Sequence, residues 1–197
     1  MDGIECKAPE HIPTLETERL ILRPFAEDDF AAVHSYGSNP ENVKYMVWGP
    51  NSEEDTRKFL SETIEKGKRN PALDYDFAVT LKETGKLIGG GGVYLNPERS
   101  QGMMGWILHM DYWKRGFGTE FCAELIRFSF EELGLHRVWA TCNAENYGSY
   151  RVMERNGMRR EAHFVQARYG RVHDEHRWYD EYHYGILRDE WMEKRDK

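Results

Sequence analysis

The stretch QGMMGWILHMDYWKRGFGTEFCAELIRFSF, residues 101–130, combines three patterns that predict the centre of a fold. Its first ten residues are mostly apolar and are typical of a β-strand. A basic loop with two glycines follows, and apolar residues then recur at helical spacing until Gly134. We therefore predict a strand at 101–110, a loop, and a helix at about 117–133. The apolar face of this helix comprises Phe121, Cys122, Leu125, Ile126, Phe128 and Phe130.

The loop before that helix is suited to binding an anion. A helix N-terminus presents unpaired N–H groups and a partial positive charge, and Lys114 and Arg115 add two cations. Gly116 and Gly118 remove side chains that would keep a phosphate at a distance. The dinucleotide-binding pattern Gly-x-Gly-x-x-Gly is incomplete, because Phe121 stands where the third glycine is required. A pyrophosphate site and a plain strand-to-helix turn are both compatible with the loop alone.

The remaining patterns predict a mixed sheet with helices on both faces. The expected strands and helices, in chain order around this centre, are a strand at 16–25, helices at 26–39 and 52–69, a hairpin at 74–96, a strand at 136–143, a helix at 145–158 and two final strands. The order is thus β-α-α-β-β-β-α-β-α-β-β, an α/β fold. The crossover through the helix at 117–133 predicts that its two flanking strands pair in parallel.

Composition limits the classes of function. The 197 residues fit a single domain, and a net charge of −7 disfavours nucleic acid or an anionic membrane as a partner. Three cysteines without a CxxC spacing indicate neither a disulfide framework nor a zinc site, so we expect a cytoplasmic protein. The HDEH stretch at 173–176 resembles a metal-binding cluster, but its alternation in an extended segment argues against one, and we expect no metal.

Four stretches, in order, resemble the GCN5-related N-acetyltransferase (GNAT) superfamily, most closely its branch of ribosomal-protein N-terminal acetyltransferases. They are TERLILRPF, GWILHMDYWKRGFGTE, NAENYGSYRVMERNGM and YDEYHYGILRDEW. The resemblance implies a single GNAT domain at 16–191, an N-terminal extension at 1–15 and a C-terminal tail at 192–197. It also implies that the central strands splay apart. In the family loop pattern Gln/Arg-x-x-Gly-x-Gly/Ala, this chain departs at the first position, which is Trp113.

The resemblance implies that acetyl-CoA is the cosubstrate, with its diphosphate on the glycine loop and its pantetheine arm between the splayed strands. One backbone amide of the strand at 101–110 would donate to the thioester carbonyl. The cofactor-binding residues implied in this way are Leu108, His109, Met110, Lys114, Arg115, Gly116, Phe117, Gly118, Thr119 and Asn146.

The resemblance also suggests catalytic residues. Asn146 matches an asparagine that binds the pantetheine arm, although Asn is equally suited to cap the helix that follows it. Many members protonate the leaving thiolate with a tyrosine, but that position here is Met153, so Ser149 is the expected proton donor. Candidates for the general base are the carboxylates of Asp76, Glu175, Asp180 and Glu181.

The expected function is acetyl transfer to a primary amine, either a protein N-terminus or a small molecule. Because Met153 replaces the tyrosine, a second hypothesis is a CoA-binding or protein-interaction module with weakened catalysis. Aromatic residues and carboxylates between 163 and 184 are suited to holding a cationic acceptor. Many relatives pair through their C-terminal strands, so a homodimer is a further expectation.

Overall fold

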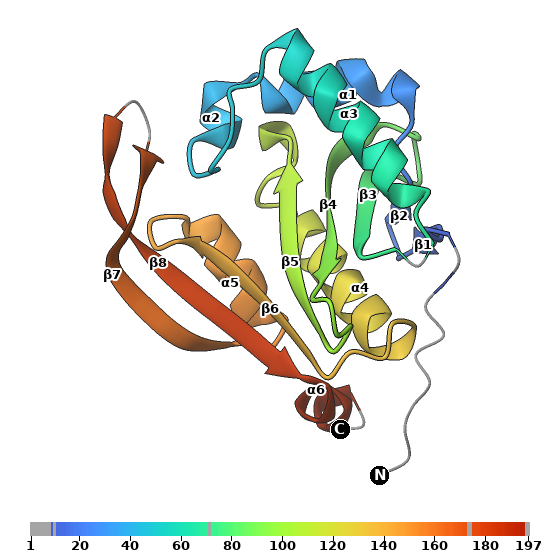
Figure 1. Ribbon diagram of the computed structural model, residues 1–197, viewed down its shortest axis with the longest axis vertical. Helices are drawn as coiled ribbons and strands as arrows, with labels where there is room; N and C mark the ends of the chain where they lie inside the picture. The colour runs from blue at the N-terminus through green and yellow to red at the C-terminus, as the bar shows by residue number, and fades with distance from the viewer. Residues whose placement is uncertain (1–8, 10, 71, 173–174, 196–197) are drawn as a thin grey trace.

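The structure is a computed structural model that describes residues 9, 11–70, 72–172 and 175–195. Its strands form one eight-stranded sheet in the order β1-β2-β3-β4-β5-β6-β8-β7 (Figure 1). The strands are β1 (Leu15–Glu16), β2 (Leu20–Arg23), β3 (Asp74–Leu81), β4 (Leu87–Leu95), β5 (Gln101–Leu108), β6 (Arg137–Asn143), β7 (Arg159–Val172) and β8 (Glu175–Leu187). The helices are α1 (Phe30–Gly37), α2 (Pro40–Val43), α3 (Glu53–Gly67), α4 (Phe117–Glu131), α5 (Tyr147–Arg155) and α6 (Arg188–Arg195).

The predicted α/β fold and element order are confirmed. Two local predictions are confirmed. Ser52 caps α3 together with Asp55, and a tight turn at Gly85 joins β3 to β4. Three short or terminal elements, β1, α2 and α6, were not predicted. The division into an extension, a domain and a tail stays a prediction.

The splay of the central strands is also confirmed. β5 and β6 run in parallel, but they pair only where Gln101, Gly102 and Met103 meet Arg137, Val138 and Trp139. Beyond these three pairs the two strands diverge, as Figure 1 shows. The remainder of β5 therefore has β4 on one side and a gap on the other.

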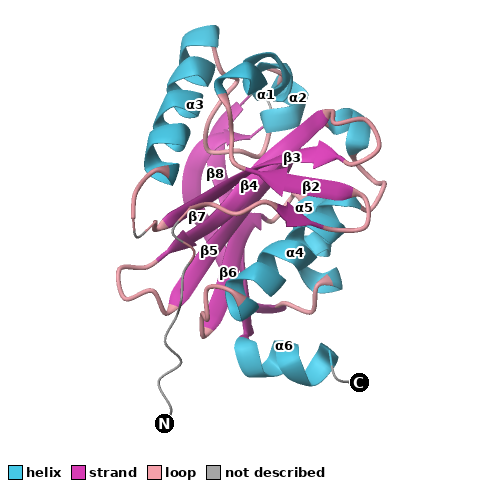
Figure 2. Ribbon diagram, turned by 90° about the vertical axis from the view of Figure 1, so that its right-hand side faces the viewer, coloured by secondary structure: helices cyan, strands magenta, loops and turns pink. Residues whose placement is uncertain are grey.

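Helices cover the sheet on two faces (Figure 2), with α1 and α3 on one and α4 and α5 on the other. The predicted apolar face of α4 is wholly buried. The ring of Phe128 packs edge-on against Tyr75 and Phe77 of β3, with centroids 5.4 and 5.6 Å apart. A smaller apolar cluster around Val33 and Leu60 holds α1 and α3 on the other face.

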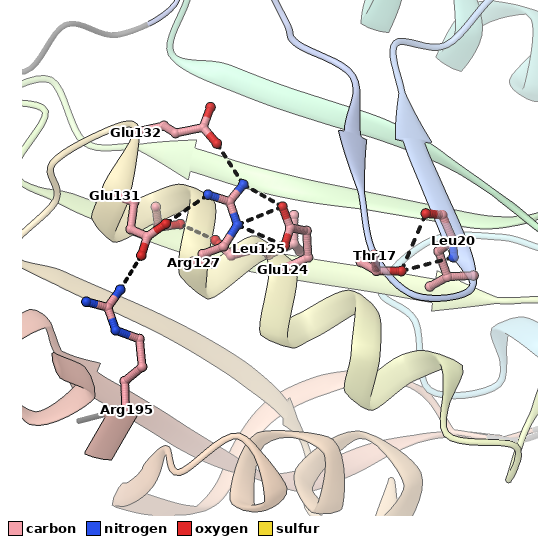
Figure 3. Close-up of polar contacts among 9 residues, drawn as sticks. Thr17, Leu20, Glu124, Leu125, Arg127, Glu131, Glu132 and Arg195 are labelled. Atoms are coloured by element: carbon pink, nitrogen blue, oxygen red, sulfur yellow. Dashed lines mark hydrogen bonds and ion pairs between the residues drawn. The ribbon is translucent and has the colours of Figure 1, made fainter. Parts of the chain in front are cut away.

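An ion-pair network at the C-terminal end of α4 also holds the C-terminal helix α6 (Figure 3). The Arg127 guanidinium contacts Glu124, Glu131 and Glu132, at 2.6, 3.0 and 2.7 Å. Glu131 also pairs with Arg195 of α6. The carboxylates around Arg127 raise the pKa of its guanidinium. The network lies at the C-terminal end of α4.

The described residues contain neither a membrane-spanning helix nor a metal-binding cluster. None of the helices in that part of the chain is long and apolar enough to cross a membrane. No group of three or more His, Cys, Asp or Glu side chains there is placed to hold a metal ion. His173 and Asp174 of the HDEH stretch lie outside the described residues.

The four consecutive glycines of β4 are required by close backbone contacts. A Cβ on Gly92 would lie 2.1 Å from the carbonyl oxygen of Tyr75, and one on Gly89 would lie 2.3 Å from that of Ile107. Both distances are far below van der Waals contact, so a side chain would displace a neighbouring strand. The tract is therefore a strand whose neighbours approach closely.

Replacing Gly92 by alanine tests this packing. We expect Gly92→Ala to lower the free energy of unfolding by about 3 kcal/mol, because the new methyl group displaces the β3 backbone. Gly105→Ala is the matched control, since a Cβ there meets its nearest atom at 3.8 Å, and it should cost less than about 1 kcal/mol. Chemical denaturation measures both values, and equal losses for the two variants would show that Gly92 is not required by its contact with β3.

Candidate active site

The edge of β5 that faces the gap carries backbone groups without a strand partner. The His109 N–H donates to the Ile88 carbonyl at 2.8 Å, on the β4 side. Because backbone groups of successive residues in an antiparallel ladder point to alternate sides, Ile107 also faces β4. The N–H groups of Trp106 and Leu108 therefore point into the gap. They are the donors available to a chain inserted between β5 and β6.

Asn42 of α2 binds the end of β5. This buried side chain donates from Nδ2 to the Leu108 carbonyl at 2.9 Å and accepts the Met110 N–H at 2.7 Å. The Trp113 indole N–H also donates to the Leu108 carbonyl, at 2.7 Å. The N–H groups of His109 and Met110 are bonded to Ile88 and Asn42, whereas that of Leu108 points into the gap, so Leu108 is the best placed of the predicted amide donors, and the set itself stays a prediction.

The N-terminus of α4 lies beside this strand end. Gly116 caps the helix in the left-handed region, at φ +84°, and Lys114 lies in the same region at φ +61°. The first N–H groups of an α-helix have no acceptor within the helix, so those of Phe117, Gly118 and Thr119 are available. The loop is therefore shaped to present backbone donors.

Contacts from the turn between β1 and β2 hold the loop in place. The Arg19 guanidinium donates to the Arg115 carbonyl at 3.1 Å and pairs with the Glu120 carboxylate at 2.6 Å. The Thr17 hydroxyl donates to the same carboxylate at 2.5 Å. These bonds lower the pKa of Glu120, although its partial burial acts in the opposite direction. Lys114 and Arg115 themselves remain exposed.

A diphosphate fits this loop. A Cβ on Gly118 would lie 3.3 Å from Val152 of α5 and 3.7 Å from the Leu108 side chain, so glycine lets two helices and β5 meet closely. The Phe117 ring is buried beneath the Arg19 guanidinium, 4.4 Å from its centroid, and only its backbone can contact a ligand. Helix donors and two exposed cations are the groups that bind a phosphate anion.

The N-terminus of α5 holds the two predicted catalytic residues. The Asn146 side chain accepts the Ser149 N–H at 3.1 Å, so its capping role is confirmed and its Nδ2 remains a possible donor to a ligand. Burial raises the pKa of the Cys142 thiol to about 12, and the neighbouring Ser149 acts on that pKa in the opposite direction. Met153 is fully buried, at 0% exposure, and has no proton to donate.

The four candidate bases have different surroundings. The Asp180 carboxylate accepts the Gln166 N–H and lies 2.6 Å from the His163 ring nitrogen. Both contacts lower the pKa of Asp180. Glu181 is paired with Arg168, and Glu175 is exposed at the start of β8. The Asp76 carboxylate accepts a hydrogen bond of 2.6 Å from the Tyr94 hydroxyl. Burial is the largest influence on Asp76 and raises its pKa.

A cavity of about 570 Å³ lies on the face of the sheet that α1 and α3 cover. Its size is in the range of small-molecule sites. The residues that line it on β3, β4 and β5 are Asp76, Gly90, Gly91, Tyr94, Gly105, Trp106 and Ile107, and its other walls include Phe25, Tyr36, Trp48 and Phe59. β5 thus borders both this cavity and the gap.

Sequence reasoning missed Asn42, Trp113 and Arg19 as parts of the site. A local signal existed only for the helix that carries Asn42. Asn39 before Pro40 is typical of a helix start, and Asn39 indeed caps α2. Nothing in the sequence indicates that the side chain of Asn42 would then reach β5, because that contact spans 66 positions in the chain.

Comparisons with known proteins agree with this geometry. The family model described as an acetyltransferase (GNAT) domain matches residues 19–159. An uncharacterized N-acetyltransferase, YnaD of Bacillus subtilis strain 168, is 35% identical over 177 residues, which covers 90% of this chain and 98% of YnaD. The crystal structure of a GNAT-family acetyltransferase from Bacillus anthracis has 34% identity and a TM-score of 0.78, covering 90% of this chain and 100% of that one.

A more distant structure shares the fold. It is a spermidine N-acetyltransferase from Vibrio cholerae, solved in complex with CoA and spermine, with 20% identity and a TM-score of 0.76. The match covers 89% of this chain and 99% of that one. The assignment to a family rests instead on the sequence matches to the family model and to the Bacillus relatives. The chain therefore belongs to the GNAT family of acetyl-CoA-dependent N-acetyltransferases.

Proposed function

We propose that this enzyme transfers the acetyl group of acetyl-CoA directly to a primary amine at the gap between β5 and β6. The observation that supports this most strongly is the limited pairing of the two strands, which leaves the donors of Trp106 and Leu108 facing an open edge. The N-termini of α4 and α5 flank the same edge. The diphosphate would lie on Gly116 to Thr119, near Lys114 and Arg115, and the pantetheine arm between the strands.

The residues divide the chemistry among them. An N–C bond forms, the C–S bond breaks, one proton leaves the amine and one reaches the sulfur. The Leu108 or Trp106 N–H is oriented to stabilise the oxygen of the attacked carbonyl; one such donor contributes about 3 kcal/mol in other acyl transfers. Asn146 Nδ2 holds the arm, and the Ser149 hydroxyl delivers the proton to the sulfur.

A module that binds CoA without acetylating anything was the alternative suggested by Met153. The Met153 side chain is fully buried and has no proton to donate, so this position cannot supply the proton that a tyrosine would supply. The proton must therefore come from another group, and Ser149 on the preceding turn of α5 supplies one. An assay of free thiol release with a panel of amines distinguishes the two, since the module would release none with any acceptor.

A Cβ at the N-terminus of α4 tests the diphosphate site. We expect Gly116→Ala to weaken CoA binding by about tenfold or more, because a left-handed alanine reorients the N–H groups that hold the anion. Gly134→Ala is the matched control: it too places a Cβ on a left-handed residue, at φ +65°, but beyond the far end of α4. Titration calorimetry should show normal affinity for the control, and a similar loss in both would reject the site.

A second prediction concerns the proton donor. Ser149→Ala should lower kcat by about 100-fold, the scale of general acid catalysis, while the Kd for CoA stays near normal. Ser149→Thr keeps the hydroxyl and should recover most of the turnover. Steady-state thiol release gives both values. Unchanged turnover in the alanine variant, or no recovery with threonine, would eliminate this role for Ser149.

A further inference from the structure

Asp76 differs from the other buried carboxylates of the described chain in having no cation at ion-pair distance, although the charge of Lys66 acts on it from further away. Those others are Asp29, Glu124 and Glu181, and each is paired with an arginine, at 2.6, 2.6 and 3.0 Å respectively. Figure 3 shows one such pair, Glu124 with Arg127. Among the residues that the structure describes, no Lys, Arg or His lies at ion-pair distance from Asp76, which is only 7% exposed.

An unpaired buried carboxylate is costly, because burial removes its hydration without supplying an opposite charge. The single hydrogen bond from the Tyr94 hydroxyl offsets part of that cost. Asp76 is also one of the residues that line the 570 Å³ cavity. The missing cation is therefore best supplied by a molecule inside the cavity.

The rest of the lining suits a cation with an apolar body. Aromatic side chains of Tyr36, Trp48 and Phe59 form walls, and rings of this kind attract cations and pack against alkyl chains. Of the exposed charged residues in the lining, Lys58 and Glu62 lie 3.9 Å apart and offset each other. Asp55 is occupied in capping α3 through Ser52. Asp76 is thus the buried charge among the described residues that line the cavity, whereas Asp55, Lys58 and Glu62 are exposed to solvent.

The position of Asp76 in the sheet argues against its candidacy as the general base. Asp76 is in register with Gly92, and Gly92 is in register with Gly105 of β5. Neighbouring strands are about 4.8 Å apart, so Asp76 starts about 10 Å from β5, whose far edge borders the gap. A base must come within about 3 Å of the proton that it removes. The carboxylate is too distant for that but well placed for the far end of an acceptor.

We propose that this cavity binds the acceptor and that the acceptor is a primary amine with a second cationic group. The second cation would contact Asp76, roughly 10 Å or more from the reacting nitrogen, and an apolar spacer would lie against the aromatic walls. The proposal depends on the proposed function, because it places the reacting amine at the gap. It names α,ω-diamines and similar compact dications as the substrate class, in preference to protein N-termini.

The test compares straight-chain diamines with monoamines of equal length. Hexamethylenediamine and hexylamine serve as the central pair, flanked by shorter and longer homologues, with thiol release as the readout. We expect the wild-type enzyme to favour the best diamine over its monoamine by at least tenfold in kcat/KM. Asp76→Asn keeps the size of the side chain and an acceptor for Tyr94, and it should abolish that preference while leaving the monoamine rate within about twofold.

Three controls make the result decisive. Glu62→Gln removes a carboxylate at the rim and should keep the diamine preference. Asp76→Asn should be at least as stable as the wild type, because it removes an uncompensated buried charge. CoA affinity should be unchanged in both variants.

Other outcomes would overturn the proposal. Equal losses for diamine and monoamine in Asp76→Asn would indicate a base or a structural role. No effect on either amine, or acetylation of peptide N-termini with no diamine turnover, would place the acceptor elsewhere. If no amine is acetylated at all, the proposed function fails, and diamine binding is then tested by thermal shift: a shift lost in Asp76→Asn supports the cavity site, and no shift in the wild type rejects it.

Discussion

The rest of this structure depends on one constraint: β5, an interior strand of the sheet, pairs with β6 along only part of its length. After three residue pairs β5 parts from β6, and the backbone groups beyond Met103 on that edge have no ladder to complete. Unsatisfied backbone groups inside a protein are costly, so such an edge persists only where the surroundings enforce it. Here β4 holds the other edge continuously, and Asn42 reproduces two strand-like hydrogen bonds at the end of β5. What remains open, at Trp106 and Leu108, is the edge along which we propose that an extended ligand pairs as a strand would.

The same strand connects two sites of opposite charge. At its end, the α4 N-terminus with Lys114 and Arg115 forms a positive region in a protein whose net charge is −7. On the face toward α1 and α3, the cavity contains the unpaired carboxylate of Asp76. An anionic coenzyme and a cationic acceptor would then approach β5 from different directions, and the reacting atoms would meet beside it. The glycines of β4 contribute by letting the neighbouring strands pack closely beneath this cavity.

The sequence was most informative where structure is set by neighbours along the chain. The apolar stripe of α4, the Ser52 cap and the Gly85 turn each follow from residues within a few positions of one another, and each was predicted correctly. The splay of β5 and β6 came from family resemblance alone, because no local pattern indicates where two strands stop pairing. Contacts across long separations were not predictable, and Asn42 and Arg19 are the clearest cases. The lack of a cation beside Asp76 is likewise visible only when all neighbours in space are known.

Amide hydrogen exchange along β5 tests the central claim most directly. In the free protein, the N–H groups of Trp106 and Leu108 face the gap without a strand partner, whereas the N–H of His109 is bonded to Ile88. Addition of CoA should slow exchange at Trp106 and Leu108 and at the first turn of α4, and leave His109 little changed. Unaltered exchange at Trp106 and Leu108 under saturating CoA would show that the coenzyme does not occupy the gap, and would contradict the account.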